Sequence, residues 1–145
     1  VLEECERYID FAERIEHSEV LPTFVLTRQM ARQLRGDTDD PYTLSDHRFN
    51  EAEYLETLRQ IPNQQPVHWF LLLRMRAYLT LGAADRALEV ARESDRIVEV
   101  SLGMFQVAEH YFLYTLIMGV ASGRVSHRAR RRWLRRMRRN RKRLA

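Results

Sequence analysis

Hydrophobic residues recur at steps of three and four along most of the chain, with charged residues between them. This spacing is typical of amphipathic helices, which bury one face and leave the other in water. No stretch shows the sustained alternation of apolar and polar residues that predicts a strand. The sequence therefore predicts an all-α protein. In its first segment the expected buried stripe consists of Leu2, Cys5, Ile9, Ala12 and Ile15.

Turn and capping residues divide this pattern into about seven helices. Ser18 is expected to cap a second helix, which has Pro22 in its first turn and ends at Gly36. The Asp-rich stretch from Gly36 to Phe49 is expected to form turns, with Asp46 capping or pairing locally. The residues expected to face inward on the second helix are Leu21, Phe24, Val25, Ala31 and Leu34.

Further helices are expected over residues 50–61, 66–81, 84–98 and 104–121, and a last one after a cap at Ser126. Helix 66–81 is apolar almost all round, which predicts that it is covered on more than one side. Short loops predict antiparallel neighbours, and successive pairs with open apolar faces tend to stack as a solenoid. The third helix is expected to place Ala52, Leu55 and Leu58 on one side.

One helix pair has the residue order of a tetratricopeptide unit, which runs large, aromatic, large, turn glycine, small, small. The physical basis of this order is close packing, because small residues let the second helix approach the first while the aromatic ring fills the groove beside it. We therefore expect a single tetratricopeptide-like α-solenoid domain over residues 1–145, with an Arg-rich final helix at 126–145. The matching residues are Leu71, Tyr78, Leu81, Gly82, Ala87 and Ala91.

Residues 67–123 also resemble a known family. The motifs that carry the resemblance are His68-Trp69-Phe70, Leu81-Gly82, Ala87-Leu88-Glu89 and Ala108-Glu109-His110-Tyr111-Phe112-Leu113-Tyr114, with similar segments upstream at Gln29 to Gly36 and Phe49 to Ala52. They resemble the helical region of large bacterial signalling proteins. In these, a protein-kinase-like domain and a predicted ATPase domain precede that region, and a sensor domain and often a histidine kinase follow it.

The resemblance implies a linker-scaffold between ATPase and output domains, with no catalytic residues of its own. Where the family usually has an acidic residue and an aromatic after the turn glycine, this chain has Ala83 and Ala84. The sequence begins inside a helical pattern and ends without a cap, so we expect a section of a longer chain. No signal peptide or membrane-spanning run is visible, which favours a cytoplasmic location.

Charge is divided unevenly along the chain. Residues 1–123 carry 20 acidic and 12 basic residues, a balance of −8, whereas residues 124–145 carry 12 basic residues and no acidic one, a balance of +12. The last helix therefore offers a basic surface, for which three interpretations remain open. It pairs with the acidic body or a neighbouring domain, it binds nucleic-acid phosphates, or it lies on an anionic membrane with Trp133 as an anchor. The expected basic surface consists of Arg131, Arg132, Arg135, Arg136, Arg138 and Arg139.

Four aromatic residues are candidates for a partner-binding groove. They are either core fillers of a stacked-helix protein or anchors that grip a partner segment, as aromatic side chains do in interfaces. We expect the partner to be another domain of the same parent chain or a separate protein, with nucleic acid as the alternative. The four candidates are Trp69, Tyr78, Tyr111 and Tyr114.

The sequence shows no arrangement typical of an active site. The five histidines have no zinc-binding spacing, and the single cysteine, Cys5, has no partner for a disulfide. The Asp-rich stretch has Tyr42 and Arg48 where a calcium loop needs glycine and glutamate. We therefore expect no catalytic residue, metal or cofactor in this region, although the parent chain is expected to bind ATP.

Overall fold

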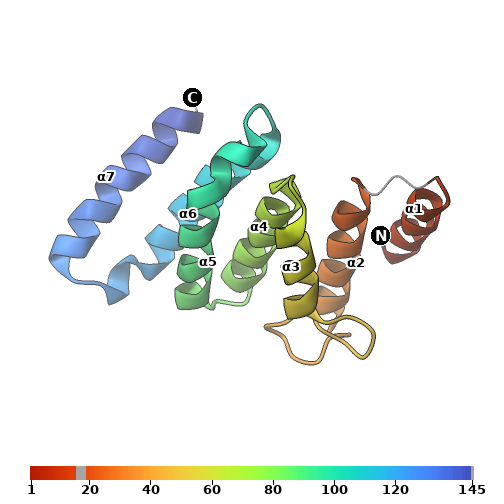
Figure 1. Cartoon of the computed structure of the whole chain (residues 1–145). Coiled ribbons are helices and arrows are strands. Elements are labelled where there is room, and N and C mark those ends of the chain that lie inside the picture. Colours follow the sequence, from red (N-terminus) through yellow and green to blue (C-terminus); the bar gives the residue numbers. More distant parts are fainter. Residues whose placement is uncertain (16–18, 145) are drawn as a thin grey trace. The chain divides into compact units, whose positions relative to one another are not determined.

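The computed structural model describes residues 1–15 and 19–144, and the regular structure of these residues is helical. The elements are α1 (Leu2–Arg14), α2 (Leu21–Arg35), α3 (Glu51–Gln60), α4 (Gln65–Thr80), α5 (Ala84–Ile97), α6 (Phe105–Ala121) and α7 (His127–Leu144), with 3₁₀ turns η1 (Val98–Ser101) and η2 (Ser122–Arg124) (Figure 1). Extended pairing in the described part is limited to one isolated bridge between Asp46 and Phe49. The predicted all-α class with seven helices is confirmed for these residues.

The chain divides into two compact units, residues 1–70 and 71–145, and the boundary falls inside α4. In the first unit α1 packs on α2. In the second unit α6 packs on both α5 and α7. Helices that follow one another in the sequence are therefore neighbours in space within each unit.

The buried faces of α1 and α2 differ in part from the expected ones. Cys5, Ile9 and Ala12 are buried as predicted, but Ile15 is 51% exposed because α1 ends at Arg14 and the stripe ends with it. On α2 the prediction for Leu34 is wrong, since its side chain is 61% exposed. The buried residues of α2 include two glutamines, which a prediction based on hydrophobicity does not place in the core. They are Pro22, Leu26, Gln29, Met30 and Gln33.

The ends of α2 follow local chemistry. Pro22 lies in its first turn, and Gly36 ends the helix with a left-handed φ of 81°, a conformation that glycine adopts without strain. Both features were predicted. The expected cap at Ser18 lies outside the described residues.

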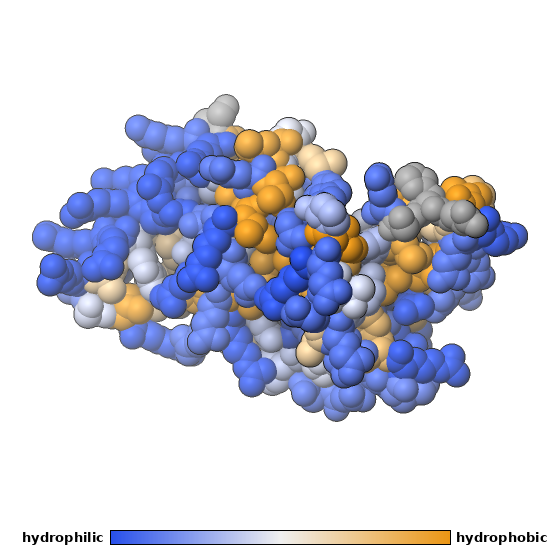
Figure 2. Space-filling view, viewed as in Figure 1, coloured by the Kyte–Doolittle hydropathy of each residue, from blue (hydrophilic) through white to orange (hydrophobic). Residues whose placement is uncertain are grey.

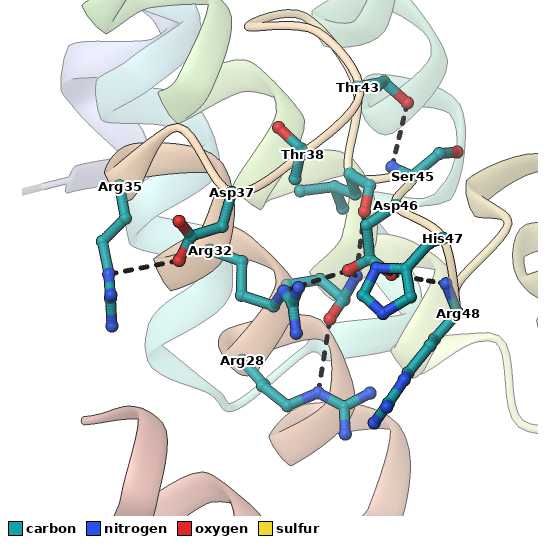
Figure 3. A network of polar contacts seen from close by, with 12 residues as sticks. Arg28, Arg32, Arg35, Asp37, Thr38, Thr43, Ser45, Asp46, His47 and Arg48 are labelled. Atoms are coloured by element: carbon teal, nitrogen blue, oxygen red, sulfur yellow. Dashed lines mark hydrogen bonds and ion pairs between the residues drawn. The ribbon is translucent and has the colours of Figure 1, made fainter.

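A buried amide organises the loop after α2 (Figure 3). The Nε2 of Gln29 donates to the carbonyl oxygen of Leu44 at 2.9 Å and to the Asp46 carboxylate at 3.0 Å. Asp46 also pairs with the Nε of Arg32 at 3.0 Å and accepts from the backbone N–H of Arg48 at 2.8 Å. The predicted local pairing of Asp46 is confirmed.

These partners set the charge state of Asp46. Burial of the carboxyl group would raise its pKa, but the hydrogen bonds from Gln29 and Arg48 and the charge of Arg32 lower the pKa below its ordinary value. The carboxylate therefore stays ionised inside the loop. Beyond the loop, α3 begins at Asn50, whose side chain accepts from the N–H groups of Ala52 and Glu53.

The third and fourth helices differ in how much they bury. On α3, Leu58 is 1% exposed and Leu55 is half-buried, but Ala52 is exposed, so the expected position of Ala52 on the buried side is wrong. On α4, by contrast, the predicted cover on more than one side is confirmed, because from Val67 to Ala77 only Trp69 and Arg76 are not buried. After α4 the chain turns at Gly82, with φ of 71°, and α5 follows with Ala84, Ala87 and Ala91, each at most 2% exposed.

The last two helices bury polar groups as well as apolar ones. On α6, His110 is fully buried beside Tyr111 and Tyr114, while the apolar residues Phe112, Leu116 and Val120 are exposed. On α7 the predicted cap is confirmed, because the Oγ of Ser126 accepts from the N–H of Ala129 at 3.3 Å. On α7, Asn140 is fully buried, whereas Leu144 is 41% exposed.

Candidate functional site

An arginine-rimmed groove of about 540 Å³ lies between α6 and α7 in the second unit. Its floor consists of Tyr114 and Met118 from α6 and Trp133 from α7. Its rim is formed by arginines of α7, and none of the described residues that line it is acidic. We refer to it as the arginine groove, and its lining residues are Tyr114, Met118, Arg132, Trp133, Arg135, Arg136 and Arg139.

The sequence of α7 explains how this helix lies on α6. It carries 11 basic residues and no acidic one, so only its narrow face with Trp133, Met137 and Asn140 can be covered. Asn140 is fully buried, donates to the Oγ1 of Thr115 on α6 at 3.3 Å and accepts from the Nε of Arg136 at 3.2 Å. The amide thereby fixes the register of α7 against α6.

Two arginines of α7 are held by partners in the same unit. Arg136 donates to the carboxylate of Asp95 on α5, and its guanidinium lies 5.4 Å from the ring centre of Tyr114. Arg143 donates to the hydroxyl of Tyr111, and its guanidinium lies 4.9 Å from that ring. Such stacked and hydrogen-bonded guanidinium groups are ordered by the protein. Arg132, Arg135 and Arg139, by contrast, are exposed to solvent. Hydrophilic side chains cover the region of α7, at the left of Figure 2.

Beneath Arg136 lies a buried cluster of Ser94, His110 and Asp95. The Oγ of Ser94 lies 2.8 Å from the Nδ1 of His110, and the Nε2 of His110 lies 3.4 Å from the Asp95 carboxylate. These residue types also form hydrolytic triads, but there the serine faces Nε2 and the aspartate faces Nδ1, the reverse of this arrangement. Ser94 and His110 are both fully buried, so a substrate has no access to either. The cluster therefore holds helices together.

The charge state of His110 agrees with this structural role. Burial lowers the pKa of His110 to about 4, although the neighbouring Asp95 partly opposes the shift. The ring is therefore neutral near pH 7. Burial also raises the pKa of Tyr114, which keeps its hydroxyl protonated at the floor of the arginine groove. The groove consequently offers guanidinium donors and neutral aromatic surface, which together suit an anionic ligand with an apolar part.

The structure brings some of the predicted site residues together and separates others. Of the six predicted basic residues, four line the arginine groove and two, Arg131 and Arg138, are exposed away from it.

Of the four aromatic candidates, Tyr114 lies in the groove. Tyr111 borders a smaller groove of about 280 Å³ together with Arg143. Tyr78 is covered by the guanidinium of Arg74, 4.4 Å from its ring centre. Trp69 is half-buried on the part of α4 that belongs to the first unit.

Sequence reasoning missed three residues that shape this region. Met118, at the floor of the groove, was not singled out, and Asp95 looked like one of many surface carboxylates. Asn140 carried a usable signal, because it interrupts the arginine run on the same helical stripe as Trp133 and Met137. A polar residue on an otherwise apolar stripe indicates a buried hydrogen bond.

Comparison with known proteins gives no relative. No family model, curated protein or solved structure matches this chain.

Two properties of the described residues limit the chemistry. Within residues 1–15 and 19–144, no group of histidine, cysteine, aspartate and glutamate side chains is arranged to hold a metal ion. None of the helices described is long and apolar enough to cross a membrane. The arginine groove remains the place where the structure concentrates charge, aromatic surface and a concave shape.

Proposed function

We propose that the chain is a non-catalytic protein-interaction scaffold that joins domains in a signalling ATPase or histidine kinase. The observation that carries the proposal is that the arginines of α7 fall into two groups, those that bind within the unit and those that face solvent. Arg136 and Arg143 fasten the helix to its own unit, while Arg132, Arg135 and Arg139 remain exposed at a concave surface. A helix held this firmly presents a preformed surface, which reduces the entropy lost on binding.

The proposal includes a tetratricopeptide-like arrangement of the helices, which the turn and the small residues of α5 support. Gly82 makes the turn between α4 and α5, and Ala87 and Ala91 are fully buried on α5, as close helix packing requires. Helical repeats of this kind present extended surfaces on which partners dock. Phe112, Leu116 and Val120 add an exposed apolar row on α6.

The link to signalling rests on the resemblance of residues 67–123 to the helical region of the large bacterial signalling proteins. Within that region, Glu109 receives a hydrogen bond from Arg76, which joins α4 to α6, and His110 lies in the buried cluster with Ser94. The motif from Ala108 to Tyr114 thus supplies packing and polar contacts of the second unit, which is the role of a scaffold.

Nucleic-acid binding is the second candidate function. One observation favours it: α7 carries 11 basic residues without a compensating acidic residue. Such a cluster is the electrostatic footprint of phosphate binding, and it predicts an affinity that falls steeply with salt.

Site-specific photocrosslinking in living cells separates the two candidates. A photoreactive phenylalanine replaces Leu134, which is 47% exposed on α7, or Val1, which is 81% exposed outside α7, as the control position. We expect adducts at position 134 with domains of the parent chain or with a signalling protein, identified by mass spectrometry. Adducts with DNA or RNA instead, together with tight oligonucleotide binding at about 50 mM salt, would support the second candidate and contradict the first.

The signalling assignment has its own test. The transcript that encodes these residues is sequenced beyond both ends of the chain. A kinase-like or nucleotide-binding domain upstream and a sensor or histidine-kinase domain downstream are the expected result. A coding sequence that continues into an unrelated enzyme would contradict the assignment.

A further inference from the structure

We propose that the arginine groove binds an acidic segment of a protein partner, whose carboxylates pair with the rim while an aliphatic side chain of the segment lies on the floor. The inference rests on the proposed scaffold function and adds the chemistry of the partner. It follows from the spacing of the rim arginines, the burial of the floor residues and the basic charge of the second unit.

The rim forms a regular row of guanidinium groups. Arg132, Arg135 and Arg139 stand three and four residues apart, so they lie on one side of α7. At 1.5 Å per residue the row is about 10 Å long. A partner helix with carboxylates at the same three- and four-residue steps presents them at matching intervals. Each guanidinium can take a carboxylate with two parallel hydrogen bonds.

Arg136, the fourth arginine of the groove, already contacts a carboxylate of the same chain. Arg136 pairs with Asp95, and the side chains of both residues are 23% exposed. Because Asn140 holds the Nε of Arg136 and Tyr114 lies beside its guanidinium, the inner wall of the groove is fixed. A partner therefore meets an ordered wall and adds carboxylates to the outer three arginines.

The floor favours a small aliphatic group over a nucleobase. Tyr114 is 8% exposed and Met118 is 1% exposed, so neither offers an open face. Binding of single-stranded nucleic acid relies on aromatic rings whose faces are open for bases to stack on. Tyr114, moreover, already has the guanidinium of Arg136 as a neighbour. An aliphatic side chain needs only the edges of Tyr114 and Trp133.

The charge of the second unit also favours an acidic occupant. Residues 71–123 carry 5 basic and 6 acidic residues, and residues 124–145 carry 12 basic residues and no acidic one. The unit that holds the groove is therefore strongly basic, and it attracts a segment rich in carboxylates.

The test uses the full 145-residue chain and a fluorescein-labelled peptide of four Glu-Glu-Leu repeats. Fluorescence anisotropy at about 100 mM salt, where surface charges farther apart than about 10 Å are screened, measures binding. Peptides of Gln-Gln-Leu and Glu-Glu-Ser repeats test the carboxylates and the aliphatic group separately. A labelled oligonucleotide of twelve thymidines represents the nucleic-acid alternative.

Two double substitutions provide a matched comparison. Arg132→Glu with Arg139→Glu alters the groove, and Arg131→Glu with Arg138→Glu alters the same helix outside it. Both pairs are seven residues apart, both lie at exposed positions, and both change the net charge equally. The groove variant is expected to weaken peptide binding at least tenfold, about 1.4 kcal/mol, while the other weakens it less than about threefold.

Several outcomes would overturn the proposal. They are an equal loss in both variants, binding of the Gln-Gln-Leu peptide as tight as that of the acidic one, tighter binding of the oligonucleotide, and no peptide binding at all. Self-association in sedimentation velocity that competes with the peptide would also overturn it, by identifying a second copy as the occupant. If the peptide fails while crosslinks from position 134 to protein persist, the acidic-segment proposal is wrong and the scaffold function stands. Crosslinks to nucleic acid alone contradict the scaffold function itself.

Discussion

Arg136 on α7 donates to the carboxylate of Asp95 on α5, and this contact joins two helices that are separated in the sequence by the whole of α6. The two side chains are equally and only partly exposed, so water screens the pair less than it screens a surface pair. The same guanidinium is hydrogen-bonded to Asn140. Together with Asn140 and Arg143, Arg136 therefore attaches α7 to the rest of its unit.

Replacement of Arg136 by glutamine should lower the free energy of unfolding by about 2 kcal/mol, because charge-assisted hydrogen bonds to Asp95 and Asn140 are lost. Urea unfolding followed by circular dichroism measures the change from the shift in midpoint. Arg138→Gln, at an exposed position of the same helix, serves as the control and should change stability by less than about 0.5 kcal/mol. Equal effects of the two substitutions would contradict the assigned role of Arg136.

Stability should fall between pH 6.5 and 4 because of His110. Its pKa falls from the ordinary 6.5 to about 4 in the folded chain, so in this range the unfolded chain binds a proton that the folded chain does not. The free energy of unfolding therefore rises with pH through this window and levels off above it. The full effect is on the order of 3 kcal/mol. Urea unfolding at pH 7, 5.5 and 4.5 measures it.

His110→Gln is the matching control for the pH series. Glutamine fills part of the same space and does not titrate, so the variant should be less stable at pH 7 but lose less stability on acidification. Asp46 does not interfere, because its pKa lies below its ordinary value and its contribution is lost only at still lower pH. Parallel pH profiles for the two proteins would show that His110 does not set the dependence.

Gln29→Leu should destabilise the first unit by about 2 kcal/mol, because the substitution removes the side-chain donor to the buried carbonyl of Leu44 and one of the donors to the Asp46 carboxylate. Amide hydrogen exchange should also become faster over residues 37–49. Arg35→Gln removes an exposed pair with Asp37 and should leave both measurements almost unchanged. Unchanged exchange in the Gln29 variant would mean that the amide does not hold the loop.

Two glycines should respond to alanine with opposite signs. Gly82 has φ of 71°, so Gly82→Ala should cost about 1 kcal/mol through backbone strain alone, because an added Cβ has open space around it. Gly119 lies inside α6, where an added Cβ would meet the Cε of Met137 at 3.6 Å, an ordinary contact. Gly119→Ala should therefore stabilise the protein by about 0.5–1 kcal/mol. Thermal unfolding of both variants tests the pair, and a shift in the same direction would contradict it.

The sequence predicted helix ends better than helix faces, and the reason is physical. Gly36, Gly82 and Ser126 act within a few residues of themselves, so their effects on helix ends are visible locally. The face that a helix buries depends on partners far away in the sequence. Leu34 is exposed while Gln29 is buried, because Gln29 has Leu44 and Asp46 to bind and hydrophobicity does not record such partners.

The sequence predicted which residues form the candidate site, but not how they are arranged in space. The basic run of α7 and the aromatic Tyr114 were identified from the sequence, and both line the arginine groove. The separation of Arg131 and Arg138 from the other four arginines needed the orientation of the helix, which depends on Asn140 and Trp133. The position of Asn140 on the apolar stripe indicates a buried hydrogen bond, but its partner Thr115 is a tertiary contact that no local rule identifies.

Because the orientation of α7 is fixed, arginines at different positions of this helix have different surroundings and different roles. A saturation mutagenesis profile along residues 127–144 would rise and fall with the helical period, with minima of tolerance at Trp133, Arg136 and Asn140 and maxima at Arg131 and Arg138. A segment that is more than half arginine would thus behave in genetic selection as an ordered helix with distinguishable sites. Under the proposed function, exchange of its exposed arginines for other residues would alter partner specificity and leave the fold intact.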